Sequence, residues 1–216
     1  DFLIGLSFFT VALSFYVKIE AQFTLPKLIS LRVCTLLLVL FWIYRIQKGE
    51  VKTISRNVFF IGVALGSWWV ISTLFALHKY TALNGIYNRY AGFWNQGTYL
   101  LLFFIITSMP MSAKRVERIL HIMILALTTV SIFALFQFYH VEMFGWLDTT
   151  ESWGRSFSTI GQPVPLAALL GLSLPFIITF LFQNECLKGS SYWGILLLII
   201  LLAVVSTVSR GPWIGM

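Results

Sequence analysis

The chain has 216 residues, of which 58% are hydrophobic and only 11% are charged. A soluble domain carries about 25% charged residues on its surface, so this composition excludes a soluble enzyme and a disordered protein. The net charge of +7 comes from Lys and Arg residues in separate loops, which also excludes a nucleic-acid-binding domain. The chain is therefore predicted to lie in a lipid bilayer, with no nucleic acid as a partner.

Seven apolar runs follow one another along the chain, and most carry no interior charge. A helix crosses a bilayer with about 20 apolar residues, and runs such as Gly194–Ala203 do not alternate as barrel strands do. The predicted fold is an all-α bundle of about seven transmembrane helices, in one domain over residues 1–216 of a longer protein. The runs are Phe2–Val17, Leu28–Tyr44, Asn57–Leu77, Phe93–Met109, Ile119–Tyr139, Val164–Phe182 and Tyr192–Val208.

Loop charges predict the orientation of these helices. The connections Arg45–Arg56 and Ala113–Arg118 are rich in Lys and Arg, whereas Val141–Gln162 is mainly acidic. Cytoplasmic loops carry the excess of Lys and Arg, so the two basic connections and the amino terminus are expected to be cytoplasmic. Three arginines then lie on the outer face: Arg89, Arg155 and Arg210.

The segment Val208–Trp213 places Arg210 at the outer end of the seventh run. A charged side chain near a span is costly unless it pairs or snorkels to the interface. Gly211 and Pro212 are expected to interrupt the helix, and an arginine beside such a break suits a phosphate through forked hydrogen bonds. The alternative is an arginine that only anchors the end of a span.

Two further outer segments place an arginine among glycines and polar or aromatic residues. Gly154–Pro163 contains Arg155 and leads into the sixth run; its alternative role is an ordinary turn that caps a helix. Gly85–Gly92 contains Arg89; its alternative role is an interfacial loop anchored by tyrosines.

Other residue types point to structure rather than to chemistry. Gly62 and Gly66 form a GxxxG pattern, which predicts helix packing. Cys34 lies in an apolar run and Cys186 in a short loop, so no disulfide framework is indicated. None of the three histidines has metal-ligand spacing, and we expect neither a metal nor a cofactor. These histidines are His78, His121 and His140.

The three arginine segments together resemble the O-antigen ligase and polymerase family. Arg155–Ala168 is similar to that family's Arg…Gly-Thr-x-Gly-Asn-Pro-Asn…Leu-Ala pattern, and Thr207–Gly211 to its Thr-x-Ser-Arg-Gly signature. Gly85–Gly92 is similar to its earlier Gly…Arg-Tyr-x-Gly element, and the order and spacing agree from about Asn57 onward. The chain departs from the pattern at Gln162–Val164, where Asn-Pro-Asn is common.

The resemblance implies a glycosyltransferase of the bacterial inner membrane with about a dozen helices. Such enzymes take a glycan from an undecaprenyl pyrophosphate carrier at the periplasmic face. They pass it to a hydroxyl of the lipopolysaccharide core, of another repeat unit or of a protein. Arg210 would match the family arginine that holds the pyrophosphate, and Arg155 and Arg89 are further candidate ligands. The family's proposed catalytic His would lie beyond Met216, so these residues alone are expected to be inactive.

Two other classes of function stay open on the sequence. A transporter or flippase for lipid-linked sugars would also need outer arginines, but repeated halves or matching broken helices are expected of it, and neither is seen. A non-catalytic membrane scaffold would leave the three outer arginines without a common role.

Overall fold

The computed structural model describes residues 2–18, 22–87, 89–141, 154–183 and 187–215. These residues form helices joined by short connections, and no strand occurs among them. The all-α prediction is therefore confirmed. The acidic part of the Val141–Gln162 loop and Cys186 lie outside the described residues.

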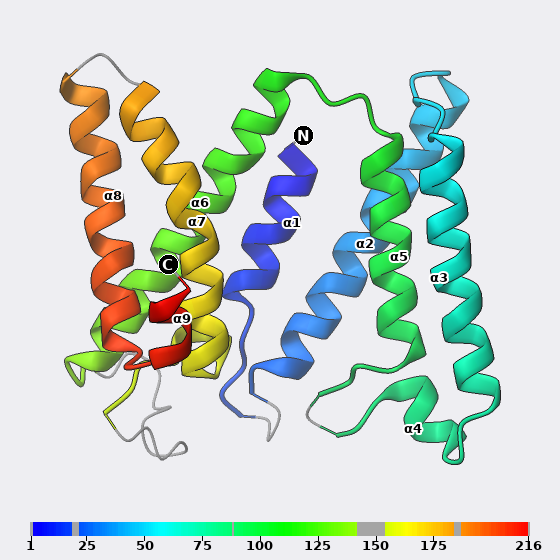
Figure 1. The fold of residues 1–216 in the computed structure, drawn as a ribbon, viewed down its shortest axis with the longest axis horizontal. Coiled ribbons are helices and arrows are strands. Elements are labelled where there is room, and N and C mark those ends of the chain that lie inside the picture. The colour runs from blue at the N-terminus through cyan, green and yellow to red at the C-terminus, as the bar shows by residue number, and fades with distance from the viewer. Residues whose placement is uncertain (1, 19–21, 88, 142–153, 184–186, 216) are drawn as a thin grey trace. The chain divides into compact units, whose positions relative to one another are not determined.

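Each of the seven apolar runs lies on a helix, and three short helical elements were not expected from the sequence: α4, the 3₁₀ turn η2 and α9. Figure 1 shows the elements in chain order. They are α1 (Phe2–Leu13), α2 (Thr24–Gln47), α3 (Arg56–Leu74), α4 (Lys79–Asn84), α5 (Phe93–Ser108), α6 (Ala113–Phe138), η2 (Ser158–Ile160), α7 (Pro163–Gln183), α8 (Leu187–Ser206) and α9 (Arg210–Ile214).

Four of the described helices are long and apolar enough to cross a membrane, namely α2, α3, α6 and α7. They support a membrane protein, but they do not confirm all seven expected spans. The remaining runs form shorter helices: α1 has 12 residues, α5 has 16, and the apolar part of α8 is Ser190–Ser206.

The first helix ends at Leu13, four residues before the end of its apolar run. The hydroxyl of Thr159 donates a hydrogen bond of 2.8 Å to the carbonyl of Ala12. A carbonyl in the last turn of a helix has no partner within that helix, so this bond satisfies it. Beyond this point the backbone N–H of Tyr16 donates to the carbonyl of Gln22 at 2.9 Å, and the chain turns instead of continuing the helix.

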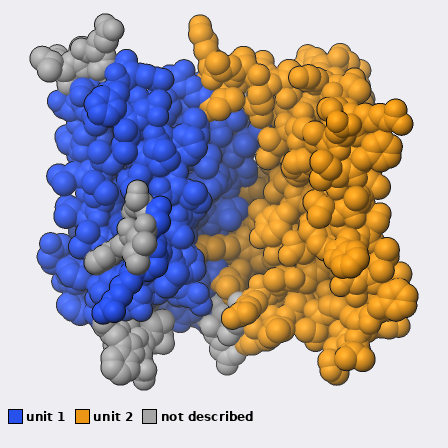
Figure 2. All heavy atoms as spheres, in the orientation of Figure 1, with its two compact units in different colours: residues 1–23, 117–216 blue, residues 24–116 orange. Residues whose placement is uncertain are grey.

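The chain forms two compact units, which are coloured separately in Figure 2 and described separately here. Unit 1 comprises residues 1–23 and 117–216, and unit 2 comprises residues 24–116. The core of unit 1 lies between α6, α7 and α8, where apolar side chains from all three helices are fully buried. They include Val130, Ala134, Leu166, Leu170, Ile177, Ile200 and Ala203.

In unit 2, the GxxxG pattern packs α3 against α5, as the sequence predicts. A Cβ atom at Gly62 would overlap the ring of Phe104, and one at Gly66 would lie 3.0 Å from Leu100 Cδ2. The absence of side chains at these two positions therefore allows the close approach of α3 and α5.

Replacing Gly62 by Ile is expected to destabilise unit 2. The new side chain would force Phe104 out of its place, and overpacking of this kind costs about 1–3 kcal/mol of folding free energy. Thermal unfolding of the purified protein in detergent measures the effect. Gly97→Ile on α5 is the matched control, because no atom lies within 4 Å of its Cβ position. Equal stability of the two variants would contradict this packing.

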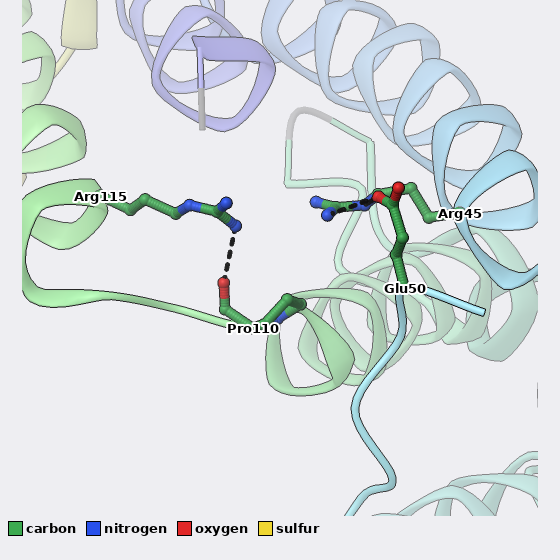
Figure 3. A network of polar contacts seen from close by, with 4 residues as sticks. All are labelled: Arg45, Glu50, Pro110 and Arg115. Carbon is green, nitrogen blue, oxygen red and sulfur yellow. Dashed lines mark hydrogen bonds and ion pairs between the residues drawn. The ribbon is translucent and has the colours of Figure 1, made fainter. Parts of the chain in front are cut away.

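The basic connection Arg45–Arg56 lies beside the start of α6 at one end of unit 2, part of which is drawn in Figure 3. Residues Ala113–Arg118, which the sequence led us to expect as a second connection, are helical and form the first turns of α6. Arg45 forms an ion pair with Glu50, with Nη2 and Oε2 2.9 Å apart, and Arg115 Nη1 donates to the carbonyl of Pro110 at 2.9 Å. The backbone N–H of Lys52 donates to the carbonyl of Ser108 at 2.8 Å. The connection Arg45–Arg56 therefore lies at the same end of this unit as the end of α5; the cytoplasmic location of the basic residues stays a prediction.

Candidate anion-binding site

The segment Arg155–Gly161 runs through the interior of unit 1, and we call it the re-entrant segment. Ser156, Ser158 and Thr159 are completely buried, although most of the segment is not helical. Buried non-helical backbone is tolerated only where protein groups satisfy its N–H and C=O groups. The contacts of the re-entrant segment therefore explain how it can lie there.

Side chains and carbonyls of two neighbouring helices hold the re-entrant segment. On α6, Gln137 Oε1 accepts hydrogen bonds from the backbone N–H groups of Phe157, at 2.9 Å, and Ser158, at 2.8 Å. The hydroxyl of Ser158 donates to the carbonyl of Val130 at 2.6 Å. On α1, the carbonyl of Ala12 accepts the hydrogen bond from the hydroxyl of Thr159 that was described above. Four hydrogen bonds thus fix this stretch against α6 and α1.

Gly161 ends the re-entrant segment and turns the chain into α7. Its φ is +87°, a region that L-residues with side chains rarely adopt. A Cβ atom there would also lie 2.6 Å from the ring of Phe23, which packs edge-on against Phe157. Both the backbone conformation and the space require glycine at this position.

Arg155 joins the re-entrant segment to the segment that precedes Arg210. Its Nε donates to the carbonyl of Thr207 at 3.1 Å, and its Nη2 donates to the hydroxyl of Ser209 at 3.0 Å. The backbone N–H of Ser156 adds a hydrogen bond of 3.1 Å to the carbonyl of Ser206. Two of the segments that the sequence singled out, more than fifty residues apart, therefore meet in unit 1.

The helix break next to Arg210 lies before it rather than after it. The sequence led us to expect that Gly211 and Pro212 interrupt the helix, but both lie inside α9, which begins at Arg210. The break is at Thr207–Ser209, where Val208 has φ +48°. Proline is compatible with a first helical turn, because the N–H that it lacks has no partner there. Arg210 itself is exposed.

Two buried polar atoms beside this junction lack a hydrogen-bond partner among the described residues. They are Ser156 Oγ and Gln137 Nε2. An unsatisfied buried donor or acceptor costs about 1–3 kcal/mol unless a ligand or a buried water meets it.

Backbone strain is concentrated in the three arginine segments. Among the described residues other than glycine, four have positive φ: Tyr90, His140, Ser158 and Val208. Tyr90 follows Arg89, Ser158 lies in the re-entrant segment and Val208 precedes Ser209. For the β-branched Val208 this conformation is a genuine outlier, and strain of this kind tends to occur at functional sites.

An apolar groove of about 560 Å³ lies between α7 and α9. Ala167, Gly171 and Pro175 line it on α7, and Pro212 lines it on α9, two residues after Arg210. A groove of this volume can hold part of an alkyl or isoprenoid chain. The exposed arginine and the apolar groove thus belong to the same short helix.

Arg89 lies in unit 2, at the tip of a loop whose two ends touch. A Cβ atom at Gly85 would lie 2.6 Å from the carbonyl carbon of Tyr90, and one at Gly92 would lie 2.5 Å from the carbonyl carbon of Asn84. Gly85 and Gly92 therefore bring the two ends of the loop into contact and close its neck. Arg89 is exposed there, and Asn88 lies outside the described residues.

Replacing Gly85 by Ala is expected to open this loop. Gly85 has φ +88°, and the new methyl group would overlap the backbone of Tyr90–Gly92. Gly49→Ala is the control, because Gly49 has φ +69° with no atom within 4 Å of its Cβ position. The control variant should lose about 1 kcal/mol of stability through strain alone, and Gly85→Ala clearly more. Protease cleavage within residues 85–92 measures loop opening; equal cleavage of both variants would contradict the closed neck.

The three histidines lie on or next to helices in the described part of the chain. His121 stacks on Phe180, with ring centroids 4.6 Å apart, and on Trp193 at 5.1 Å, near the start of α6. His78 precedes α4. Among the described residues, no three His, Cys, Asp or Glu side chains are close enough together to hold a metal ion.

Sequence reasoning missed Gln137 and Arg32. Gln137 is buried near the end of α6, and its signal was a lone amide in the apolar run Ile119–Tyr139. Arg32 is an exposed charge inside α2, within the run Leu28–Tyr44. In a membrane protein, a polar or ionisable residue within an apolar run is therefore a candidate site residue.

No family model, no curated protein and no solved structure matches this chain.

Proposed function

We propose that the protein is a glycosyltransferase of the O-antigen ligase and polymerase type in the bacterial inner membrane. In this proposal α1, α5 and α8 also cross the membrane, which makes seven spans of about a dozen in the whole protein. The amino terminus is cytoplasmic, and Arg89, Arg155 and Arg210 lie at the periplasmic face. The donor is a glycan on undecaprenyl pyrophosphate, and the acceptor is a sugar or protein hydroxyl.

The observation that carries the proposal is the junction between Arg155 and the Thr207–Ser209 segment. Two guanidinium nitrogens of Arg155 hold the backbone and hydroxyl next to Arg210. This arrangement fixes the backbone that leads into Arg210, the first residue of α9. Fixed positive charge is what stabilises a developing anion, because no reorganisation is needed during the reaction.

The two arginines of unit 1 then have different tasks. Arg155 is chiefly a positioning residue, since Nε and Nη2 are engaged; only its Nη1 makes no hydrogen bond with a described residue. Arg210 is exposed and presents its whole guanidinium group, which can form paired, charge-assisted hydrogen bonds with phosphate oxygens. Arg89 is a third candidate ligand, on the closed loop of unit 2.

The reaction forms a bond between the acceptor oxygen and the anomeric carbon of the donor sugar. The bond from that carbon to the pyrophosphate breaks, and its electron pair stays on the leaving oxygen. The hydroxyl proton goes to a general base that we do not assign. Arg210 would stabilise the negative charge on the pyrophosphate, and the groove between α7 and α9 would hold the first isoprene units of the carrier.

Direct binding tests this assignment of the groove and Arg210. The intact protein, purified in detergent, is heated with undecaprenyl pyrophosphate, undecaprenyl phosphate or neither. We expect the pyrophosphate to raise the unfolding temperature most, because a ligand that binds only the folded state stabilises it, and Arg210→Ala should remove that difference. An equal effect of both lipids on the wild type would contradict pyrophosphate recognition.

A further inference from the structure

A second groove, also mainly apolar, lies in unit 2, and one of its lining residues, Asn84, also forms the neck of the Arg89 loop. It has a volume of about 440 Å³ and is lined by residues of α2, α5 and the end of α4. At its centre is Arg32, which lies about 12 Å along the axis from the start of the spanning helix α2. Figure 1 shows α2 beginning at the end of unit 2 where α4 lies. The lining residues are Arg32, Thr35, Leu36, Asn84, Trp94, Thr98 and Leu101.

Arg32 lacks a counter-charge within unit 2. Among the described residues, none makes a hydrogen bond or ion pair with it. The sequence of residues 24–116 contains a single acidic residue, Glu50, and this residue already pairs with Arg45 at the other end of α2. An arginine inside a spanning segment is costly unless an anion or water meets its guanidinium group. No carboxylate of unit 2 is left to pair with Arg32, so an anion that meets it would come from outside this unit.

The groove offers hydrogen-bond donors and no carboxylate. Beside the guanidinium of Arg32, Asn84 keeps one amide N–H after donating the other to the carbonyl of Tyr80 at 3.2 Å. The indole N–H of Trp94 makes no hydrogen bond with a described residue. The guanidinium and indole groups only donate, and Asn84 adds an N–H group beside its carbonyl oxygen, so an anion with several oxygens suits this set of donors.

The surroundings of the groove indicate that this anion belongs to a lipid. Leu36, Trp94 and Leu101 are exposed along its rim, so apolar surface faces the place where the acyl chains of a bilayer would lie. Tryptophan is typical of the interface between headgroups and chains. Free phosphate would gain nothing from this apolar rim, whereas a lipid phosphate would use both parts.

We propose that the Arg32 groove binds the phosphate of an anionic phospholipid. Arg32 makes the charge-assisted contacts, Asn84 and Trp94 add donors, and Leu36 and Leu101 contact the acyl chains. This proposal does not depend on the proposed transferase function, because it uses none of the three arginines of that proposal, although Arg89 also lies in unit 2.

Native mass spectrometry of the intact protein tests the proposal. The protein is purified in a neutral detergent and titrated with phosphatidylglycerol. Replacing Arg32 by Gln should raise the dissociation constant about tenfold or more, since a hydrogen bond to a charged group contributes that much. Lys79→Gln is the matched control: it removes one positive charge from α4 without touching the groove, and its affinity should stay within about twofold of the wild type.

Titrations with other anions identify the source of the anion, and a second variant keeps the test valid if Arg32→Gln misfolds. Inorganic phosphate and undecaprenyl phosphate are titrated separately, and preferential binding of either would overturn a phospholipid ligand. Thr98→Leu fills the groove and leaves Arg32 in place, so it should weaken phosphatidylglycerol binding even if the Arg32 variant does not fold. Wild-type affinity in Arg32→Gln, or in Thr98→Leu, would overturn the proposal.

Discussion

Replacing Arg210 by Ala is expected to lower the rate of glycan transfer by the intact protein about 10²–10³-fold. Removal of one fixed group that stabilises developing charge has an effect of this size. Arg210→Lys should also lose much of the activity, because an ammonium group cannot make the paired contacts of a guanidinium group. Transfer from a polyprenyl pyrophosphate donor at matched expression is the measurement.

Two controls separate catalysis from anchoring. Gly211→Ala should be nearly neutral, since no atom lies within 4 Å of its Cβ position. Arg56→Ala removes the same charge at the first residue of α3 and should leave transfer unchanged. An arginine that only anchors a helix tolerates Lys almost fully. Near-normal transfer by Arg210→Lys would therefore reduce Arg210 to an anchor.

Replacing Gln137 by Leu is expected to lower the free energy of unfolding by about 2–5 kcal/mol, because two buried N–H groups lose their acceptor. These are the backbone N–H groups of Phe157 and Ser158. Leucine has a similar volume, so the loss would come from the hydrogen bonds and not from a cavity. Thermal unfolding in detergent measures it, together with loss of transfer, since the re-entrant segment also carries Arg155.

Ser173→Ala is the comparison for this variant. Ser173 is also buried, but its hydroxyl donates only to the carbonyl of Leu170 in its own helix. Removing this hydroxyl should cost well under 1 kcal/mol of folding free energy, because the carbonyl of Leu170 still accepts its backbone hydrogen bond within the helix. If Gln137→Leu were as stable as Ser173→Ala, the re-entrant segment would not depend on α6 in the way described.

The sequence predicts the helices of this chain well, because each apolar run lies on a helix and four of these helices are long and apolar enough to cross a bilayer. It predicts their ends less well. The early end of α1 depends on Thr159, which is 147 positions away, and the end of α8 depends on a strained Val208. Neither the hydrogen bond of Thr159 nor the backbone strain at Val208 leaves a pattern in the local sequence, since hydropathy reports only whether a residue prefers lipid to water.

The candidate site could be predicted in part. Local motifs mark Arg155 and Arg210 separately, but only the structure pairs Arg155 with Thr207 and Ser209. The buried amide of Gln137 and the charge of Arg32 were each hidden in an apolar run, where one polar residue changes the average little. The roles of Gln137 and Arg32 depend on the residues around them, which only the fold brings together.

Product formation in closed proteoliposomes tests the central claim most directly. The intact protein is supplied with a labelled glycan on undecaprenyl pyrophosphate and with an acceptor that carries free hydroxyl groups. We expect a new glycosidic product and an equal amount of free undecaprenyl pyrophosphate, both lost in Arg210→Ala. Movement of the intact donor across the membrane without any product would contradict it, and would identify a transporter instead.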